Sequence, residues 1–262
     1  MMPETKAGDD RVRTRLDRRR VRRPDEGPAL SDQLLGAFSH ELRTPLNAIV
    51  GHADLLCDAL GPQLDDDAKR SLDVIIRSAM RLTNLVNDTI DLARLRIGTL
   101  RLEVRRFDAA PLIAEVSETF APLAAAKGLT MTCRVLPAAI PVETDAHRLR
   151  QTLRYVIDNA IKFTARGEVR VCGYGTDDAL LVEIFDTGIG IRQTDRARVF
   201  EDFHQVDGSS TRSYDGCGLG LAISRRLVTM MGGTIDVESE PGRGSCFCVS
   251  VPRRPSRCTD AQ

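Results

Sequence analysis

The sequence predicts a two-domain α+β protein in which a helical hairpin precedes a two-layer α/β sandwich. The first observation is a pair of long stretches, 29–60 and 67–96, with apolar residues at heptad spacing and the breaker Gly61-Pro62 between them. The second is the change beyond Phe107, where short runs rich in β-branched and aromatic residues alternate with helical stretches. A chain of 262 residues with 42% hydrophobic and 28% charged residues can build one or two domains of this kind.

The composition excludes several classes of protein. The 37 Lys+Arg balance the 37 Asp+Glu, so no global field draws the molecule towards nucleic acid or anionic membrane. No apolar run reaches the roughly 18 residues of a transmembrane helix, and the Arg-rich start lacks the apolar core of a signal peptide. The seven cysteines are scattered, and the one close pair, Cys246 and Cys248, lacks the usual zinc spacing. We therefore expect a cytoplasmic chain with reduced thiols, no transmembrane segment and no nucleic-acid partner.

Residues 1–28 differ from the rest of the chain. The stretch RVRTRLDRRRVRRPDEGP has almost no large apolar residues, so burial cannot offset its ordering entropy, and we expect a basic flexible tail or linker. The alternative is a basic arm for nucleic acid or acidic lipid, which the acidic residues and the lack of aromatic residues disfavour. Residues 254–262 are expected to form a C-terminal tail.

The two long helices are predicted from their seams. In the first helix the seam series are Leu35, Leu42, Ile49 and Leu56, and Phe38, Pro45, His52 and Ala59. In the second helix the seam residues are Leu72, Ile75, Ala79, Leu82, Val86 and Ala93. The acidic run Asp65–Asp67 suits the N-terminus of the second helix. A single hairpin leaves apolar surface exposed, so we expect residues 29–97 to dimerise into a four-helix bundle.

A connector is expected at 98–106, and the sandwich at 107–253. The predicted helices lie at 108–126, 145–164 and about 217–231. The predicted strands lie at 129–135, 168–174, 180–185, 234–239 and 245–251. Mixed helices and mainly antiparallel strands imply a two-layer α/β sandwich.

His40 is the first candidate for chemistry. It lies at the heptad position farthest from the seam, so its imidazole is expected to face solvent, where a neutral ring nitrogen can act as a nucleophile. Glu41 beside it can polarise the ring or accept its proton. Arg43 and Thr44 share its helical face, and Pro45 is expected to kink the helix just beyond it. On the residues alone, an inert surface histidine is the alternative.

Three glycine clusters follow in the second domain. They are Asp186-Thr187-Gly188-Ile189-Gly190-Ile191, Gly216-Cys217-Gly218-Leu219-Gly220-Leu221 and Pro241-Gly242-Arg243-Gly244-Ser245. Glycine lets backbone N–H groups approach an anion closely, and a helix N-terminus adds a favourable dipole. The P-loop pattern is absent, and the glycine spacing of the second cluster is wrong for a Rossmann site. The third cluster taken alone is better explained by a tight turn.

The helix predicted at 145–164 carries Asn159 and Lys162 within the run YVIDNAIKFT. An Asn in an amphipathic helix needs polar partners. A metal-bound phosphate would provide them, because Mg²⁺ prefers oxygen ligands and retains waters. On the residue alone, a surface or capping role for Asn159 is the alternative.

The segment FSHELRTPLNAIVGHADLL resembles the phospho-accepting H-box of sensor histidine kinases. This resemblance implies that His40 is phosphorylated at a ring nitrogen and that Glu41 is the neighbouring base. It also implies that Thr44 positions water in a second activity, the dephosphorylation of a partner protein.

The Asn159 helix, DTGIGI, the segment FEDFHQ and GCGLGLAI occur in an order that resembles the ATP-binding catalytic domain of histidine kinases, in the superfamily of type II topoisomerases and MutL proteins. The resemblance implies that Asn159 holds Mg²⁺, that Lys162 approaches the phosphates and that Asp186 accepts a hydrogen bond from the adenine amino group. The glycines are implied to shape the base pocket at Gly188 and Gly190, to admit the triphosphate at Gly216, Gly218 and Gly220, and to close the site with Gly242, Gly244 and Ser245. Residues 206–215 would form a lid. The chain departs from the family at Tyr155, where a second Asn is frequent.

Together these motifs predict an ATP-dependent protein-histidine kinase that autophosphorylates on His40 and passes the phosphoryl group to an Asp of a response-regulator receiver domain. The expected cofactors are ATP and Mg²⁺, the expected assembly is a homodimer, and a sensor protein or domain is expected upstream. One alternative is a dimeric scaffold that binds ATP or a regulator without transfer, which Tyr155 slightly favours. Another is a different ATPase of the same superfamily, which the HELRTPL helix disfavours.

Overall fold

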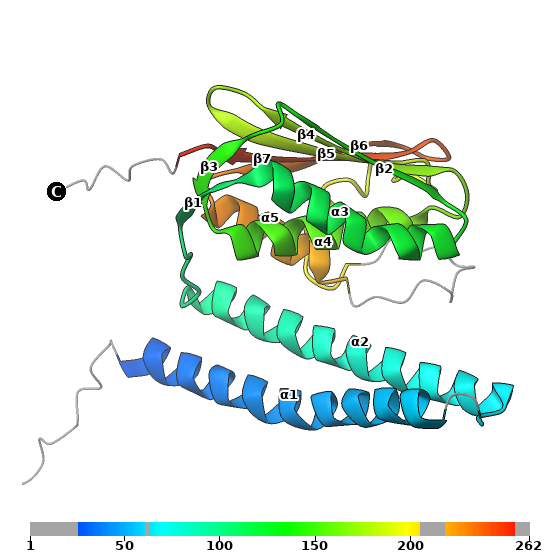
Figure 1. Ribbon diagram of the computed structural model, residues 1–262. Coiled ribbons are helices and arrows are strands. Elements are labelled where there is room, and N and C mark those ends of the chain that lie inside the picture. Colours follow the sequence, from blue (N-terminus) through cyan, green and yellow to red (C-terminus); the bar gives the residue numbers. More distant parts are fainter. Residues whose placement is uncertain (1–25, 61–62, 205–217, 255–262) are drawn as a thin grey trace, which may run out of the picture.

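In the computed structural model, a long helical hairpin lies along one side of an α/β sandwich (Figure 1). The structure describes residues 26–60, 63–204 and 218–254, without the side chains of 26–34 and 38–40. The helical layer of the sandwich faces the hairpin, and the sheet forms the far layer (Figure 1). The predicted fold class, a helical hairpin followed by a two-layer sandwich, is confirmed.

Capping residues fix the ends of the second helix of the hairpin. The side chain of Asp65 accepts a hydrogen bond from the Ala68 N–H at 2.7 Å, and Gly98 ends the helix in the left-handed region with φ 77°. These caps satisfy backbone groups that a helix leaves unpaired.

The first helix continues through Pro45 without a break. None of the helices in the described ranges has the length and hydropathy needed to cross a membrane. The hairpin consists of α1 (Glu26–Leu60) and α2 (Asp66–Ile97).

The hairpin buries only part of its apolar surface. Leu46 and Ala53 of α1 and Ala79 of α2 are buried. A neighbouring apolar row stays exposed: Leu42, Ile49 and Leu56 on α1 are 44%, 47% and 45% exposed, and Ile75 and Leu82 on α2 are 45% and 47% exposed. His52 of the predicted seam is exposed as well. None of the predicted seam residues of α1 whose side chains the structure describes is buried, and Ala79 is the one buried residue of the predicted α2 seam. The buried residues of α1, Leu46 and Ala53, lie on a neighbouring row that the heptad prediction did not include.

The sandwich contains a five-stranded sheet in the order β2-β4-β5-β7-β6. All neighbours are antiparallel except the edge strand β2, which runs parallel to β4. β1 and β3 pair separately as an antiparallel ribbon. The strands are β1 (Arg105–Asp108), β2 (Thr130–Leu136), β3 (Pro141–Thr144), β4 (Glu168–Gly175), β5 (Ala179–Asp186), β6 (Thr234–Glu240) and β7 (Gly244–Pro252).

The core of the sandwich lies between the sheet and its helical layer (Figure 1). Every second residue of β5, Leu180, Val182 and Ile184, is fully buried, as expected for a strand with one face on the core. The apolar stripe of α4 at helical spacing consists of Leu149, Leu153, Val156, Ile157, Ala160 and Ile161. The helices are α3 (Ala109–Ala126), α4 (Ala146–Phe163) and α5 (Gly220–Met230), with a short 3-10 helix η1 (Arg198–Phe200).

Two short strands and one helix start differ from the sequence prediction. β1 begins at Arg105, inside the expected connector, and β3 falls where no element was expected. Each has four residues, which is too short for an alternating pattern to be recognised. The last helix starts at Gly220 rather than near 217. The other helices and strands lie within a few residues of their predicted bounds.

An apolar cluster joins the hairpin to the sandwich. Leu92 at the C-terminal end of α2 and Leu100 just after it pack with Leu219, Ile223 and Leu227 in and before α5. Fully burying a side chain of this size contributes roughly 1.5–3 kcal/mol relative to leaving it exposed. The cluster therefore sets which face of α2 is turned towards α4 and α5.

Candidate functional site

α4 carries the polar residues Asn159 and Lys162. The helix begins at Asp145, whose carboxylate accepts a hydrogen bond from the Arg148 N–H at 3.0 Å. Because the apolar stripe of α4 packs on the sheet, Asn159 lies at the edge of the buried face and is half-buried. Among the described residues no group hydrogen-bonds to the Asn159 side chain, so its amide oxygen is available to a ligand.

A lysine from the end of α3 lies against the C-terminal end of α4. Lys127 Nζ donates hydrogen bonds to the carbonyl oxygens of Ile161 and Lys162, both at 2.7 Å. The ammonium group opposes the partial negative charge of the helix end. Desolvation lowers the pKa of Lys127. Nζ of the half-buried Lys162 lies 4.9 Å from the centroid of the Phe163 ring.

Asp186 is the last residue of β5 and is buried, with 3% of its surface exposed. Its Oδ1 accepts a hydrogen bond from the Gly188 N–H at 2.8 Å. Burial raises the pKa of this carboxyl, and hydrogen bonds from Gly188, Ser245 and Thr164 offset part of the rise. A buried acceptor at the end of a central strand is suited to a hydrogen-bond donor of a bound ligand.

Close backbone approaches account for the glycines around Asp186. A Cβ on Gly188 would lie 2.5 Å from the last carbonyl oxygen of α4, and a Cβ on Gly244 would lie 1.9 Å from the Asp186 carbonyl oxygen. A Cβ on Gly190 would lie 2.0 Å from the Glu240 carbonyl oxygen, and φ at Gly190 is 66°. Because no Cβ fits at these positions, the backbone stays bare along the segments that meet at the end of β5, beside Asp186.

A serine pair ties the third glycine cluster to the loop after β5. Ser239 Oγ donates to the Gly244 carbonyl oxygen at 2.8 Å and accepts from the Ile191 N–H at 2.7 Å. The same hydroxyl lies 3.0 Å from Ser245 Oγ. Gly242, at φ 78°, borders open space at the turn. The first and third glycine clusters therefore meet at one end of the sheet.

The second glycine cluster leads into α5. Gly220 is the first residue of this helix, and a Cβ there would lie 2.9 Å from Cδ1 of Tyr155. Gly218 has φ 68°, and a Cβ there would lie 2.9 Å from a backbone carbonyl oxygen. Gly216 and the predicted lid at 206–215 lie outside the described residues.

The predicted phosphoacceptor segment lies on α1. Glu41 and Thr44 are exposed, and Arg43 Nη2 donates to Asn87 Oδ1 of α2 at 2.9 Å. The backbone of His40 belongs to the same helix. The His40 side chain lies outside the described residues, so the exposure of its imidazole stays a prediction.

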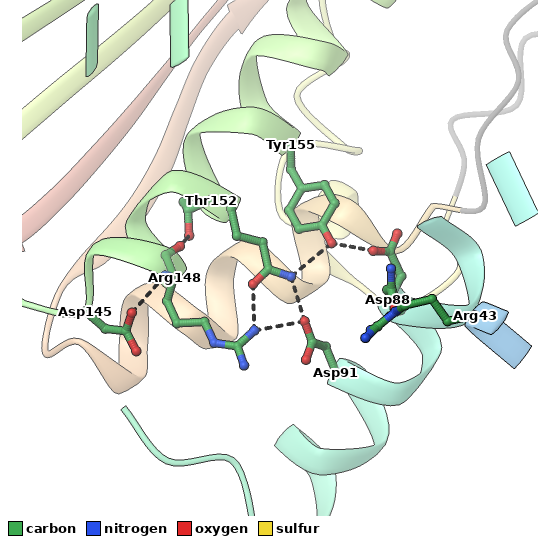
Figure 2. A network of polar contacts seen from close by, with 9 residues as sticks. Arg43, Asp88, Asp91, Asp145, Arg148, Thr152 and Tyr155 are labelled. Carbon is green, nitrogen blue, oxygen red and sulfur yellow. Dashed lines mark hydrogen bonds and ion pairs between the residues drawn. The ribbon is translucent and has the colours of Figure 1, made fainter. Parts of the chain in front are cut away.

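A polar network joins α4 to α2 (Figure 2). Arg148 Nη1 and Gln151 Nε2 donate to the same Oδ2 of Asp91, at 2.9 and 2.7 Å. The Tyr155 hydroxyl donates to the carboxylate of Asp88, whose pKa is raised by burial. The side chains of Arg148 and Asp91 are only 16% and 14% exposed. The network borders a cleft of about 490 Å³ between the hairpin and α4.

The Asn159 amide oxygen suits a metal ion whose other ligands are phosphate oxygens of a bound molecule and waters. Within the described residues no group of three His, Cys, Asp or Glu side chains could hold a metal ion. The Asn159 amide offers one neutral oxygen. Mg²⁺ is commonly bound through one or two protein oxygens together with phosphate oxygens and waters. The residues present therefore suit a Mg²⁺–phosphate complex.

The structure brings most of the predicted binding residues together. Asp186, Gly188, Gly190, Gly244 and Ser245 meet at one end of the sheet, and Asn159 and Lys162 lie on the adjoining helix. Glu41 and Thr44 lie apart from them, on the hairpin.

Several polar residues of this region were not predicted from the sequence. Thr164 and Ser239 are buried beside Asp186 and the third glycine cluster, and Arg148 and Gln151 engage α2. A threonine after a helix is typical of a cap, and a serine in a strand carries no signal of its own. The run RLRQ that holds Arg148 and Gln151 has polar residues on one helical face, which would have been the available indication.

Two family models match the chain. Residues 30–98 match the His Kinase A (phospho-acceptor) domain. Residues 144–255 match the histidine kinase-, DNA gyrase B-, and HSP90-like ATPase. The first match contains α2 and most of α1, and the second contains α4, Asp186 and all three glycine clusters.

Curated relatives are sensor kinases of greater length. The autoinducer 2 sensor kinase/phosphatase LuxQ of Vibrio cholerae is 36% identical over 88% of this chain and 27% of LuxQ. The aerobic respiration control sensor protein ArcB of Escherichia coli is 39% identical over 83% of this chain and 28% of ArcB. The chain thus spans about a quarter of the length of these relatives.

Solved structures agree with these relatives. Full-length ShkA in complex with AMPPNP has a TM-score of 0.68 and 34% identity, over 86% of this chain and 46% of ShkA. Histidine kinase ThkA in complex with response regulator protein TrrA has a TM-score of 0.59 over 88% of this chain and 65% of that chain, and at 20% identity it shows the fold alone. With its phosphoacceptor hairpin, its ATPase-type sandwich and relatives that share both, the chain belongs to the histidine kinase family.

Proposed function

We propose that this chain is an ATP-dependent protein-histidine kinase that phosphorylates its own His40. The observation that carries this proposal is the buried Asp186 carboxylate at the end of β5, next to glycines where no Cβ fits, with α4 adjoining and its Asn159 amide without a hydrogen-bond partner among the described residues. A buried polar acceptor beside glycine segments suits a nucleotide base, and backbone N–H groups suit its phosphates. The same chain carries His40 and the exposed Glu41 on α1.

The proposed function gives each residue of the nucleotide site a role in binding ATP. Asp186 accepts a hydrogen bond from the adenine amino group, in a base pocket bordered by Gly188, Gly190 and Gly244. The bare backbone at Gly218 and Gly220, together with Gly216, lies along the triphosphate, and Gly242 and Ser245 complete the loop beside the base. Lys162 contributes positive charge near the phosphates.

Asn159 would hold Mg²⁺ through its amide oxygen. Bound with the nucleotide, Mg²⁺ supplies charge neutralisation on the phosphate oxygens. A ring nitrogen of His40 attacks the γ-phosphorus, the bond between that phosphorus and the bridging oxygen breaks, and ADP leaves. Glu41 accepts the proton of the imidazole or stabilises its positive charge.

The partners follow from the exposed surfaces and from the relatives. The uncovered apolar row on both hairpin helices supports a homodimer with a four-helix bundle. An Asp in the receiver domain of a response regulator is the proposed phosphoryl acceptor, and an upstream sensor protein or domain is the proposed source of the signal. The five described cysteines are free thiols, which together with the need for ATP supports a cytoplasmic location.

A second activity is favoured by one exposed residue. Thr44 lies one turn after His40 and is open to solvent, where its hydroxyl can orient a water for hydrolysis of the phosphorylated regulator. LuxQ is named as both kinase and phosphatase. We therefore include dephosphorylation of the regulator in the proposed function.

The kinase proposal is tested with γ-labelled ATP and Mg²⁺. His40→Gln is expected to abolish acid-labile labelling. The matched control is His52→Gln, because His52 is an exposed histidine on the same helix, and it should be labelled like the wild type. Equal labelling of His40→Gln and wild type would reject His40 as the acceptor. Unchanged ATP binding by His40→Gln in calorimetry separates loss of the acceptor from loss of the nucleotide site.

A further inference from the structure

Tyr155 contacts both the hairpin and the start of α5 in the sandwich. It lies on α4, one turn before Asn159, and its hydroxyl donates a hydrogen bond to the Asp88 carboxylate of α2. Its ring lies against the start of α5, since a Cβ on Gly220 would be 2.9 Å from Cδ1 of the ring. The ring is thus packed at the glycine segment proposed to bind triphosphate, while the hydroxyl is bound to the hairpin.

The contact belongs to a network of polar side chains (Figure 2), and its members Asp88, Gln151 and Tyr155 are half-buried. Gln151 Nε2 bridges the two carboxylate contacts, because it donates to Asp91 Oδ2 at 2.7 Å and to the Tyr155 hydroxyl at 3.2 Å. Arg148 Nη1 donates to Asp91 Oδ2 at 2.9 Å and to Gln151 Oε1 at 2.8 Å. Hydrogen bonds to charged groups in such places are stronger and more directional than exposed pairs. The network therefore favours one register of α4 on α2.

That register fixes how far along the hairpin the proposed phosphate site lies. Gln151 meets Asp91, and Tyr155, one turn further along α4, meets Asp88, about one turn earlier on α2. The two helices thus run in opposite directions. One more turn along α4 brings Asn159 to the level of residue 84 of α2.

The level of the phosphoacceptor follows from the contacts of α1 with α2. A Cβ on Gly36 would lie 3.4 Å from Arg94 Nη2, and Arg43 Nη2 lies 2.9 Å from Asn87 Oδ1. His40 therefore lies at the level of residue 90 of α2. Six residues of helix, or about 9 Å, separate this level from that of Asn159. In a bundle with its twofold axis along the helices, the second protomer's copy of the same residue lies at the same level.

We propose that Tyr155 is a positioning residue whose hydrogen bond to Asp88 holds the ATP-binding domain in a resting register on α2. Phosphoryl transfer to His40 then requires this bond to break and the domain to move along the hairpin. The inference rests on the proposed kinase function. It gives the tyrosine at this position a role that the frequent asparagine, with its shorter side chain, would not fill at the same distance. The ring and the start of α5 move together, so the glycine segment and the hairpin contact are linked.

The test compares Tyr155→Phe, Asp88→Ala and the double variant. Tyr155→Phe keeps the ring against Gly220 and removes only the hydroxyl. At saturating ATP, each single variant is expected to label His40 about tenfold faster than wild type, with unchanged calorimetric affinity for ATP. The double variant should be no faster than either single variant, because both changes break the same bond. Hydrogen exchange should show faster exchange of α2 amides at 84–95 in all three variants.

Arg150→Ala is the matched control. Arg150 borders the same cleft, but its guanidinium pairs at 2.7 Å with Glu115 of α3, which belongs to the sandwich and not to the hairpin. Labelling and exchange of this variant should therefore match wild type. If wild type is labelled and Tyr155→Phe is equally fast or slower, the resting register is wrong and the kinase function stands. If exchange at 84–95 is unchanged in Tyr155→Phe, the contact does not hold the domain. If wild type acquires no label that depends on His40, the kinase proposal fails and the resting register fails with it, while faster exchange in Tyr155→Phe still identifies the docking contact.

Discussion

The Asp186 carboxyl combines binding chemistry with an energetic penalty. It is buried at the end of β5, and burial raises its pKa from the ordinary value of 3.8. The native state therefore holds the proton of Asp186 more tightly than the unfolded chain does. The free energy of unfolding decreases as the pH rises from 3.8 to the native pKa, and the lost stability is not regained above it. The same carboxylate is the acceptor in the proposed adenine contact.

Asp186→Asn should separate these two effects. Asn is neutral at every pH, so the variant lacks the decline in stability, and its unfolding free energy relative to wild type should rise as the pH increases above the ordinary Asp pKa of 3.8. Calorimetry should show that ATP binding is lost. Urea unfolding at a series of pH values measures the first effect, with the exposed Asp178→Asn as the control. A variant that loses stability relative to wild type as the pH rises would contradict the buried-charge account.

The helix α1 carries two rows of apolar residues that differ in solvent exposure. Leu46 and Ala53 are buried, whereas Leu42, Ile49 and Leu56 lie on an adjacent row and stay exposed. Repeated exposed apolar residues on one helical face indicate a surface that another helix covers. The hairpin therefore has a structural reason to pair with a second copy of itself.

Ile49→Glu should convert the expected dimer into a monomer. A carboxylate placed in the middle of the apolar row would have to be buried without a partner in a four-helix bundle. Leu55→Glu is the matched control, because Leu55 is 62% exposed and lies about 120° around the same helix from Ile49, away from this row. Light scattering coupled to size-exclusion chromatography gives the mass of each variant. A dimeric Ile49→Glu protein would show that this row is not the interface.

At the scale of the whole molecule, two charge contacts join the hairpin to the sandwich and differ in exposure. Arg148 and Asp91 are 16% and 14% exposed, whereas Arg96, which pairs with Asp202, is 58% exposed. Exposed pairs contribute about 0–1 kcal/mol and are screened by salt, whereas removing one partner of a buried pair costs about 3–5 kcal/mol. The position of the sandwich on α2 should therefore depend much more on Asp91 than on Arg96.

Asp91→Ala and Arg96→Ala test this difference by hydrogen exchange at residues 84–95 of α2. Asp91→Ala leaves the Arg148 guanidinium without its carboxylate and should speed exchange at least about tenfold. Arg96→Ala should change exchange by less than about threefold, and the change should vanish at high salt. Equal effects of the two variants would contradict the assignment of the docking energy to the less exposed pair.

The sequence predicts the parts of this molecule that are set locally. Heptad spacing places the long helices, and Asp65 and Gly98 mark the ends of α2 as capping rules require. The glycine clusters predict where the backbone must stay bare, because a Cβ at Gly190 or Gly244 would overlap a carbonyl oxygen. These signals depend on neighbours in the chain or on backbone sterics.

The contacts between distant segments could not be predicted in the same way. Tyr155 and Asp88 are 67 residues apart, and nothing in either local sequence identifies the other as its partner. Ser239 and Thr164 become part of the Asp186 site only when strands and a helix end meet. The four-residue strands β1 and β3 are defined by their pairing alone.

The lysine at the end of α3 has a consequence for the proposed nucleotide. A helix repels anions at its C-terminal end, yet the Asn159 amide that would face phosphate lies within the last turn and a half of α4. Lys127 places its ammonium group on the carbonyl oxygens of Ile161 and Lys162 and so cancels much of that repulsion from behind. An incoming polyanion would therefore meet a helix end whose partial negative charge a cation already opposes, so the approach of phosphate to this end of α4 costs less than the helix dipole alone would impose.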